Sequence, residues 1–314
     1  MTIPVIDASA LASGDKEKLV EFRTKLLNGL STYGFVKLIN HTVPVPLVTE
    51  TFDQIKKFFR LPLELKLPIA NTQTDKQQRG WCLPGEEKTW YLESNKLGIK
   101  EKEPKFSDSK ESFDCGHPND KLYPNKWPST DVLPGYQDTL EGFFYSSGDL
   151  TLVLLELIAE ALELDPTIFT SRCTNEASTI RINHFPPVDR AILDRGDVSR
   201  IWPHNDFGII SLVFLDVVQG LEYEDRSNPG TFLPLPYESD QEVVVIAGET
   251  LQRWTNGLIR AGLHRVNRPL DFDGDLVPER WSLVYFNKAN RNVNVGPLKE
   301  TTMITTKLVG FKVQ

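Results

Sequence analysis

Two histidines and an aspartate of this sequence have the side chains and spacing of metal ligands. His204 and Asp206 stand just before Ile209–Leu215, a run of β-branched and large apolar residues that predicts a buried strand. If the chain is already extended at Trp202, alternation places His204 and Asp206 on one face. His264, much later in the chain, is the candidate third ligand. Two imidazoles and a carboxylate on one side of an ion leave coordination positions open, which is typical of non-haem Fe(II) sites.

An arginine and a serine follow at a spacing that suits a carboxylate anchor. The His-x-Asp tripeptide alone is weak support, because a polar turn before a strand is its commoner explanation. Arg280 and Ser282 begin a second strand-like run, Arg280–Phe286, and share one face of it. A guanidinium can hold a carboxylate through two parallel hydrogen bonds, and a nearby hydroxyl can add a third. A single arginine more often forms an exposed salt bridge. Because Arg280 follows three candidate metal ligands in the sequence, however, an anion site beside a metal is favoured.

Composition narrows the class of partner. The chain has 43 acidic and 35 basic residues, a net charge of −8, and no basic run. These features disfavour binding to nucleic acid or to anionic membranes. A local basic pocket is compatible with this composition, so an anionic small molecule stays open as a partner. The oligomeric state does not follow from the sequence.

Cysteine usage and hydropathy indicate the compartment. Cys82, Cys115 and Cys173 are too widely spaced for a disulfide framework or a Cys-x-x-Cys metal site, which favours reduced thiols. The N-terminus has no pattern of a secretory signal. The apolar helical stretch at 150–164 is interrupted by three glutamates and is expected to be too polar to span a bilayer. We therefore expect a cytoplasmic protein.

Helical patterns dominate the first half of the chain and short strands the second. Apolar residues recur at helical spacing over 16–31, 46–60 and 136–164. Strands are predicted, between turns rich in Gly, Pro, Asp and Asn, at 3–7, 33–41, 179–185, 202–215, 221–224, 231–235, 242–247, 264–266, 281–286 and 302–308. Many short strands at this spacing indicate an antiparallel barrel or jelly roll. The predicted fold is therefore mainly β with helices (α+β), a jelly-roll core with helices packed outside.

The domain organisation follows from the same pattern. We expect a single domain over residues 1–314, with an N-terminal cap region at 1–125 and a jelly-roll core at 170–310 that carries the candidate site. Residues 71–125 are irregular and mixed in charge, but contain aromatic side chains such as Trp81 and Phe113. A long loop with aromatic residues often lines or covers a pocket, so this loop is predicted to be lid-like.

Several motifs along the whole chain occur together in one known family. They are Ile3–Asp7, Tyr33-Gly34-Phe35 with Asn40-His41, Phe58-Phe59-x-Leu61-Pro62, Arg79-Gly80-Trp81, Arg181–Pro187, His204–Gly208 with Gln219–Glu222, Gly248–Trp254 with His264-Arg265-Val266, and Arg280-x-Ser282 with Tyr285-Phe286. On these motifs the sequence resembles, nearly end to end, the 2-oxoglutarate- and Fe(II)-dependent dioxygenases of the isopenicillin N synthase-like family. The resemblance implies a double-stranded β-helix core.

The resemblance implies a role for each motif residue that matches. His204, Asp206 and His264 would bind Fe(II), and Arg280 with Ser282 would hold the distal carboxylate of 2-oxoglutarate. Asn183 lies where the family often places a polar contact to this co-substrate, although the neighbouring Phe185 replaces a tyrosine whose hydroxyl often helps. His184 alternates away from Asn183 and is expected to pack. His41, at a strand end, and His117, in a loop, are also expected to have no ligand role.

The implied reaction is oxidation of a small organic molecule by O2. Hydroxylation is the first expectation, with desaturation or ring rearrangement as variants, and the resemblance suggests a secondary metabolite. The candidate substrate contacts are Arg181, Arg190, Trp202, Phe207 and Phe286.

Two other functions stay open at this point. One is a 2-oxoglutarate-independent Fe(II) oxidase of the same fold, in which Arg280 and Ser282 would bind a carboxylate of the substrate instead. The other is a non-catalytic small-molecule binding protein that has kept the fold. Succinate formation coupled to turnover distinguishes the predicted dioxygenase from both.

Overall fold

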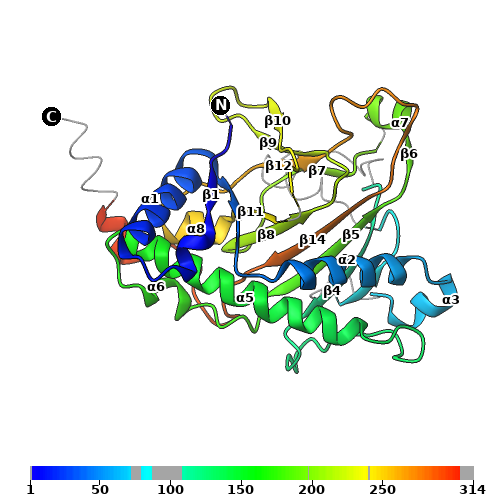
Figure 1. Cartoon of the computed structure of the whole chain (residues 1–314), viewed down its shortest axis with the longest axis horizontal. Coiled ribbons are helices and arrows are strands. Elements are labelled where there is room, and N and C mark those ends of the chain that lie inside the picture. The colour runs from blue at the N-terminus through cyan, green and yellow to red at the C-terminus, as the bar shows by residue number, and fades with distance from the viewer. Residues whose placement is uncertain (1, 72–78, 87–107, 197, 240, 305–314) are drawn as a thin grey trace.

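Two facing β-sheets form the centre of the molecule. The structure is a computed structural model that describes residues 2–71, 79–86, 108–196, 198–239 and 241–304. The larger sheet has eight strands in the order β1 (Val5–Asp7), β2 (Phe35–Ile39), β11 (Glu242–Ala247), β8 (Ile210–Leu215), β14 (Arg280–Phe286), β5 (Thr179–Phe185), β4 (Glu111–Gly116) and β3 (Gly80–Cys82). The smaller has four, in the order β10 (Phe232–Pro234), β9 (Leu221–Glu224), β12 (His264–Val266) and β7 (Ile201–His204). Every neighbouring pair is antiparallel except β1 with β2 (Figure 1).

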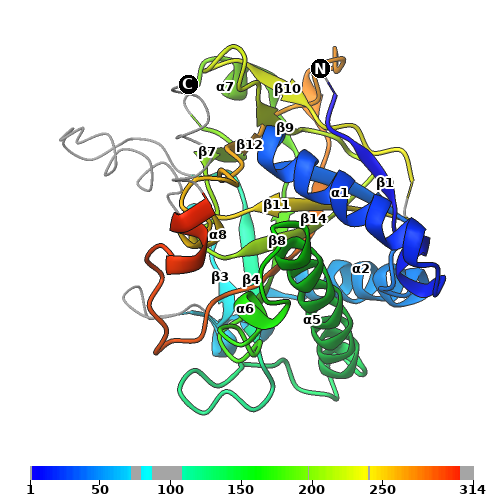
Figure 2. The same ribbon diagram turned by 90° about the vertical axis from the view of Figure 1, so that its left-hand side faces the viewer.

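Long helices cover the larger sheet on the face away from the smaller one (Figures 1 and 2). They are α1 (Lys16–Tyr33), α2 (Val45–Phe59) and α5 (Tyr136–Ala161). Asp15 caps α1 by accepting hydrogen bonds from two backbone amides of its first turn, and Gly34 ends the helix in the left-handed conformation. The shorter elements are α3 (Leu63–Lys66), α6 (Thr167–Thr170), α7 (Arg190–Asp194), α8 (Glu249–Trp254), the 3-10 helices η1 (Ala8–Ala12) and η2 (Leu67–Ile69), and a strand pair, β6 (Val188–Asp189) with β13 (Leu276–Val277).

Alternation along each strand divides the core in two. On β8, Leu212 and Phe214 pack toward the helices, whereas Val213 and Leu215 pack between the sheets. On β14, Tyr285 faces the helices and Val284 faces the smaller sheet. This arrangement leaves one face of the larger sheet, opposite the smaller one, to hold polar side chains of a site.

Helix α5 is the central helix of the helical layer. It is long and apolar enough to cross a membrane by length and composition, but 61% of the qualifying stretch is buried inside the protein. Its buried residues contact α1, α2 and the larger sheet. The burial is that of a core helix, and no other described helix meets the same length and composition test.

The strand predicted at 202–215 is two strands in different sheets. β7 ends at His204 and β8 begins at Ile210, so the prediction of one continuous strand was wrong. Residues 205–209 cross from the smaller sheet to the larger one, and Asp206 lies in this crossing. Two backbone amides at the start of α8 hold this crossing segment in place. Glu249 N donates to Asp206 O (2.8 Å), and Thr250 N donates to Gly208 O (3.0 Å).

The segment 71–125 is not irregular throughout, as its composition suggested. Residues 80–82 and 111–116 form β3 and β4, which extend the larger sheet beyond β5. Their polar residues made these strands hard to recognise from the sequence, but each charged side chain of β4 has a partner of opposite charge. Glu111 contacts Lys66, and Asp114 contacts Arg181. The part of the lid prediction at 72–78 and 87–107 lies outside the described residues. The strand expected at 302–308 was also wrong in its described part, because 302–304 are helical.

Gly248 allows α8 to approach the crossing segment closely. A Cβ there would lie 2.2 Å from Gly208 O and 3.0 Å from Asp206 O. Both are backbone atoms, so no side-chain rotation can relieve the clash. Gly248→Ala is expected to destabilise the fold by about 1–3 kcal/mol, as overpacking does, and to weaken metal binding by displacing Asp206.

Thermal unfolding and a metal titration check this prediction. Gly142→Ala in α5 is the matched control, because its Cβ would meet nothing closer than 3.7 Å. Equal unfolding temperatures and metal affinities for the two variants would contradict the prediction.

Candidate metal and co-substrate site

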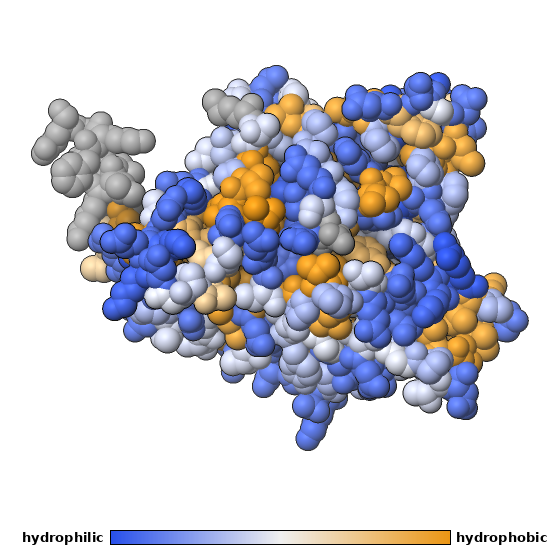
Figure 3. Space-filling view, in the orientation of Figure 1, coloured by the Kyte–Doolittle hydropathy of each residue, from blue (hydrophilic) through white to orange (hydrophobic). Residues whose placement is uncertain are grey.

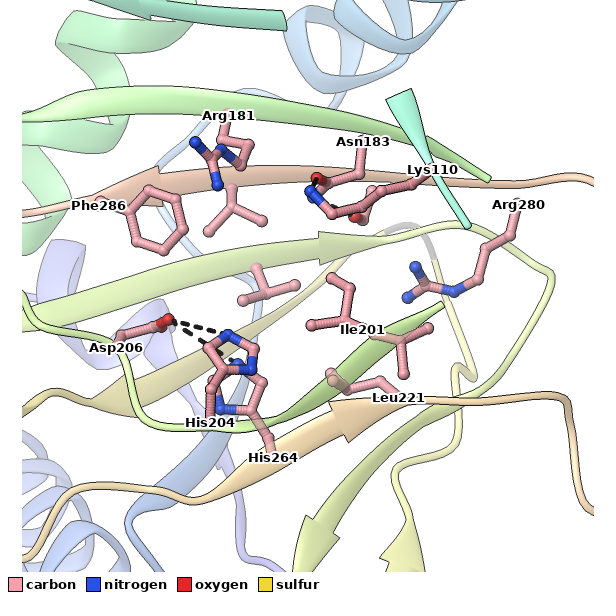
Figure 4. Close-up of a pocket in the computed structure, with 14 residues that line it drawn as sticks. Lys110, Arg181, Asn183, Ile201, His204, Asp206, Leu221, His264, Arg280 and Phe286 are labelled. Carbon is pink, nitrogen blue, oxygen red and sulfur yellow. Dashed lines mark hydrogen bonds and ion pairs between the residues drawn. The ribbon is translucent and has the colours of Figure 1, made fainter. Parts of the chain in front are cut away.

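All the predicted metal and co-substrate residues line one cavity between the two sheets (Figure 4). The empty volume of the cavity, including the open solvent at its mouth, is about 510 Å³. His204 and His264 come from the smaller sheet, and Asn183, Arg280 and Ser282 come from the larger one. Val213, Leu221, Val266 and Val284 provide apolar walls.

The two histidines meet because their strands pair. β12 is antiparallel to β7, with His264 directly opposite His204, and the ring centroids are 4.3 Å apart. Each Nδ1 faces a carbonyl oxygen, Trp202 O at 2.9 Å and Gly262 O at 3.0 Å. A carbonyl only accepts, so each Nδ1 carries the proton and each Nε2 presents its lone pair. Both imidazoles are therefore preset as ligands through Nε2.

Asp206 completes the cluster from the crossing segment. Its Oδ1 lies 3.6 Å from His204 Nε2 and 3.9 Å from His264 Nε2, and the three ligand atoms lie within 4.8 Å of one another. Ser211 Oγ donates to the other carboxylate oxygen at 2.6 Å and so orients the group. Burial, and next the neighbouring His264, lower the pKa of His204 to about 4, which favours the neutral imidazole that a metal requires.

Arg280 has the properties of an anion anchor. Its side chain is 1% exposed, and its Nε and Nη1 have no hydrogen-bond partner. Burial, and next the charge of Arg200, lower its pKa to about 9. A buried guanidinium with unsatisfied donors is costly unless an anion pairs with it. The distal carboxylate of 2-oxoglutarate has the charge and the two acceptor oxygens that this site lacks.

The sequence reasoning missed Arg200. It is fully buried, its Nη2 donates to the carbonyl of Pro278, and its Nε and Nη1 have no partner. Its guanidinium and that of Arg280 lie 5.8 and 5.2 Å from the centroid of the Phe185 ring. Arg200 does not line the cavity. Its position in the sequence, just before β7, gives no sign that its charge lies close enough to Arg280 to lower the pKa of that side chain.

The reasoning also missed Lys110, which does line the cavity. Lys110 Nζ donates to Asn183 Oδ1 at 3.1 Å, and Asn183 Nδ2 donates to Ser282 Oγ at 3.1 Å. Lys110 directly precedes β4, so alternation places it on the same face as Ser112 and Asp114. Recognising β4 from the sequence would have pointed to it.

Two of the five candidate substrate contacts, Arg181 and Phe286, line the cavity (Figure 4). Trp202 does not, because β7 has an irregularity that sets Ile201 opposite Val266 and brings Ile201 to the wall instead. Phe207 lies in the crossing segment and is 53% exposed.

Arg190, the fifth candidate, is also absent from the cavity wall. It lies at the start of α7, where it pairs with Asp194 and Asp275 and donates to the carbonyl of Asp273. Its contacts are those of a surface ion-pair cluster.

The other three histidines make contacts away from the cavity. His184 stacks on Trp281 with 4.0 Å between ring centroids, and its Nδ1 lies 2.8 Å from Glu111 Oε1. His41 packs edge-on against Phe214, and His117 packs against Phe144. None of the three is among the described residues that line the cavity.

Two family models match the chain. Residues 3–130 match the model described as non-haem dioxygenase in morphine synthesis N-terminal. Residues 176–289 match the model of the 2OG-Fe(II) oxygenase superfamily, and this second match contains the three candidate metal ligands and Arg280.

Similar proteins extend over nearly the whole chain. The 2-oxoglutarate-dependent dioxygenase ucsF of Acremonium sp. is 40% identical over 95% of this chain and 92% of its own length. The proline hydroxylase buaE of Petromyces alliaceus is 38% identical over 91% and 86%. The crystal structure of a full-length Neurospora crassa protein in complex with alpha-KG (2-oxoglutarate) and thymine has a TM-score of 0.83 and 31% identity, and the match covers 95% of this chain and 89% of that one.

Proposed function

The chain belongs to the 2OG-Fe(II) oxygenase superfamily as an isopenicillin N synthase-like, 2-oxoglutarate-dependent dioxygenase, and we propose that His204, Asp206 and His264 bind its Fe(II). The observation that carries this proposal is the preset geometry of the cluster. Both Nε2 atoms and Asp206 Oδ1 converge, with their orientations fixed by Trp202 O, Gly262 O and Ser211 Oγ.

Arg280 and Ser282 are proposed to hold the far carboxylate of 2-oxoglutarate. The orphaned Nε and Nη1 of Arg280 support this assignment, since a carboxylate can bind side-on to Nε and Nη2 or end-on to Nη1 and Nη2. Anchoring the far end fixes the co-substrate along the cavity, with its keto-acid end toward the three ligands. This holds the reactants in one orientation, which is a large part of what such a site contributes to the rate.

Iron, 2-oxoglutarate and O2 together supply the oxidant for a C–H bond of the substrate, with release of succinate and CO2. The residues of this chain bind, orient and exclude water. His204, Asp206 and His264 would hold the ion from one side, and this arrangement would leave coordination positions for the co-substrate and O2. The valine and leucine walls keep bulk water from the reacting atoms.

The substrate is proposed to occupy the end of the cavity that Arg181 and Phe286 line. On the paired strands β5 and β14, Arg280 stands opposite Phe185 at one end, and Arg181 stands opposite Val284 toward the other. Figure 4 shows Arg181 and Phe286 together at the end distant from Arg280. Asp114 holds the Arg181 guanidinium through Nε (2.9 Å) and Nη2 (3.2 Å), which leaves a fixed cation beside an aromatic ring.

This end suits a small, partly polar molecule, in size near an amino acid or a nucleobase. A relative is named proline hydroxylase, and a structural neighbour binds thymine. Hydroxylation in the biosynthesis of a secondary metabolite is the proposed outcome. We also propose a cytoplasmic location, which the free, buried thiols of Cys115 and Cys173 support.

No nucleic-acid or membrane partner is proposed. The net charge of −8 supports this view. On the face in Figure 3, hydrophobic residues occur in separate groups among hydrophilic ones, which also supports it.

Substrate-stimulated succinate release tests the function. Purified protein with Fe(II), 2-oxoglutarate and O2 would be given a panel of amino acids and pyrimidine bases, and products followed by mass for the gain of one oxygen. We expect one chemical class to stimulate succinate release in proportion to oxidised product. Oxidised product without succinate would contradict the proposed use of 2-oxoglutarate in this cavity.

A further inference from the structure

Lys110 is a buried ammonium group in the cavity that the proposed function leaves without a role. Lys110 is 3% exposed, and Figure 4 shows its side chain beside that of Asn183. Its Nζ is 3.1 Å from Asn183 Oδ1, and Asn183 Nδ2 is 3.1 Å from Ser282 Oγ. The three side chains therefore form a continuous hydrogen-bonded row that ends at the co-substrate anchor.

The chemistry of the donors fixes the direction of this row. An ammonium group can only donate, so the amide atom of Asn183 that faces Lys110 must be the oxygen. The amide nitrogen then faces Ser282 and donates to its oxygen. Since Ser282 Oγ accepts from Asn183, its own hydrogen is directed away from Asn183.

We propose that Lys110 and Asn183 are positioning residues that direct the Ser282 hydroxyl hydrogen toward the carboxylate of 2-oxoglutarate. The inference rests on the proposed contact between Ser282 and that carboxylate. It gives Asn183 a different role from the direct co-substrate contact that the family resemblance implies. Asn183 acts on the co-substrate through Ser282, and Lys110 acts through Asn183.

The strand pairing explains why these residues meet. Asn183 on β5 is directly opposite Ser282 on β14, and on its other side it is opposite Ser112 on β4. Lys110 precedes Ser112 by two residues, so it reaches Asn183 diagonally from the same face of the sheet. All three residues are at least nine-tenths buried, which excludes water as an easy substitute partner.

Loss of Lys110 removes the constraint on the amide. The oxygen and nitrogen of an amide are nearly the same size, so Asn183 can turn over without a packing penalty. Its oxygen then accepts from the Ser282 hydroxyl, and the hydrogen that should reach the carboxylate is diverted. A hydrogen bond to a charged group typically contributes 1.5–3 kcal/mol, so we expect its loss to weaken 2-oxoglutarate binding roughly tenfold or more.

A double-mutant cycle on 2-oxoglutarate affinity tests the proposal. Kd is measured anaerobically on the Fe(II)-loaded protein, from the absorption change that accompanies chelation of 2-oxoglutarate, with the variants Lys110→Met, Ser282→Ala and both together. We expect Lys110→Met to raise Kd roughly tenfold in the otherwise unchanged protein and by less than about threefold in the Ser282→Ala background. Any direct effect of the lost charge is the same in both backgrounds, so the difference measures the row of hydrogen bonds.

Two further variants separate positioning from folding. Asn183→Ala keeps the charge of Lys110 and is also expected to lose most of its effect in the Ser282→Ala background. Lys110→Arg retains a group that only donates and is expected to restore affinity relative to Lys110→Met. Circular dichroism and thermal unfolding of each variant establish that it is folded.

The outcomes distinguish this inference from the proposed function. If Lys110→Met raises Kd by the same factor in the otherwise unchanged protein and in the Ser282→Ala background, the positioning role is overturned, and the proposed co-substrate site is unaffected. If Ser282→Ala leaves Kd unchanged, the assignment of Ser282 itself is wrong and the inference falls with it.

Discussion

Asp206→Ala is expected to abolish 2-oxoglutarate-dependent oxidation and to weaken Fe(II) binding by more than ~100-fold, since losing even a residue that only supports a ligand costs roughly 10–100-fold. Asp206 supplies the only negative charge of the cluster, and its Oδ1 is 3.6 Å and 3.9 Å from the two Nε2 atoms. Without it, two neutral imidazoles would have to hold a divalent cation alone. Anaerobic calorimetry with Fe(II) and a succinate assay measure the two effects.

Asp131→Ala is the matched control for this prediction. Asp131 is an exposed turn residue that does not line the cavity, so its removal takes away the same charge without touching the site. Ser211→Ala should fall between the two, because it frees Asp206 Oδ2 from its 2.6 Å hydrogen bond but leaves the ligand in place. Fe(II) affinity in Asp206→Ala equal to that in Asp131→Ala would refute the assignment of the ligand.

The residues of the metal cluster could be predicted, because this combination of residue types is rare. The geometry of the cluster could not be predicted. His204, Asp206 and His264 were identified from the sequence, and the structure brings them together. The prediction of a continuous strand placed Asp206 on the same strand as His204. The chain instead leaves the smaller sheet after His204, which depends on backbone contacts with α8 that no local pattern encodes.

The family and the jelly-roll fold, predicted from the motifs, are confirmed by the family matches and by the structural neighbours. The same holds for the chemistry, 2-oxoglutarate-dependent oxidation of a small molecule with Fe(II), which was chosen over a 2-oxoglutarate-independent oxidase and a binding protein.

Polar residues that a strand buries were the main source of error. β4 has the sequence Glu-Ser-Phe-Asp-Cys-Gly, which resembles a loop until its partners are known. Lys66, Trp81 and His184 around Glu111, and Arg181 beside Asp114, make the strand stable. Those partners are distant in sequence, so β4 could not be recognised from its local sequence. Lys110, which directly precedes β4, was missed for the same reason.

Substrate contacts were the least predictable part of the site. Aromatic and arginine side chains suit a pocket wall, a core and a surface equally well. The structure places Arg181 and Phe286 on the cavity wall, but Phe207 is exposed and Arg190 pairs with surface acids. What separated them was the element on which each lies, because Arg181 and Phe286 are on the paired strands β5 and β14, whereas Phe207 is in the crossing segment and Arg190 begins α7.

Arg280→Met is expected to raise the KM and the Kd of 2-oxoglutarate by roughly 100-fold, because it removes a charged, bidentate hydrogen-bonding partner from a buried site. Arg280→Lys should recover only a small part of the loss. An ammonium group is a point charge and cannot make the two parallel hydrogen bonds that a guanidinium donates from Nη2 together with Nε or Nη1. Arg190→Met, which removes a surface guanidinium paired with Asp194 and Asp275, is the control and should leave both constants unchanged.

Stability provides a second test of Arg280 that does not depend on turnover. Without co-substrate, the protein buries a guanidinium whose Nε and Nη1 have no partner, so Arg280→Met should unfold at the same temperature as the parent or a higher one. With 2-oxoglutarate at about 100 times its Kd, the parent should gain about 2.7 kcal/mol, and the variant almost nothing at that concentration. A large loss of stability in co-substrate-free Arg280→Met would mean that Arg280 holds the fold together instead of waiting for an anion.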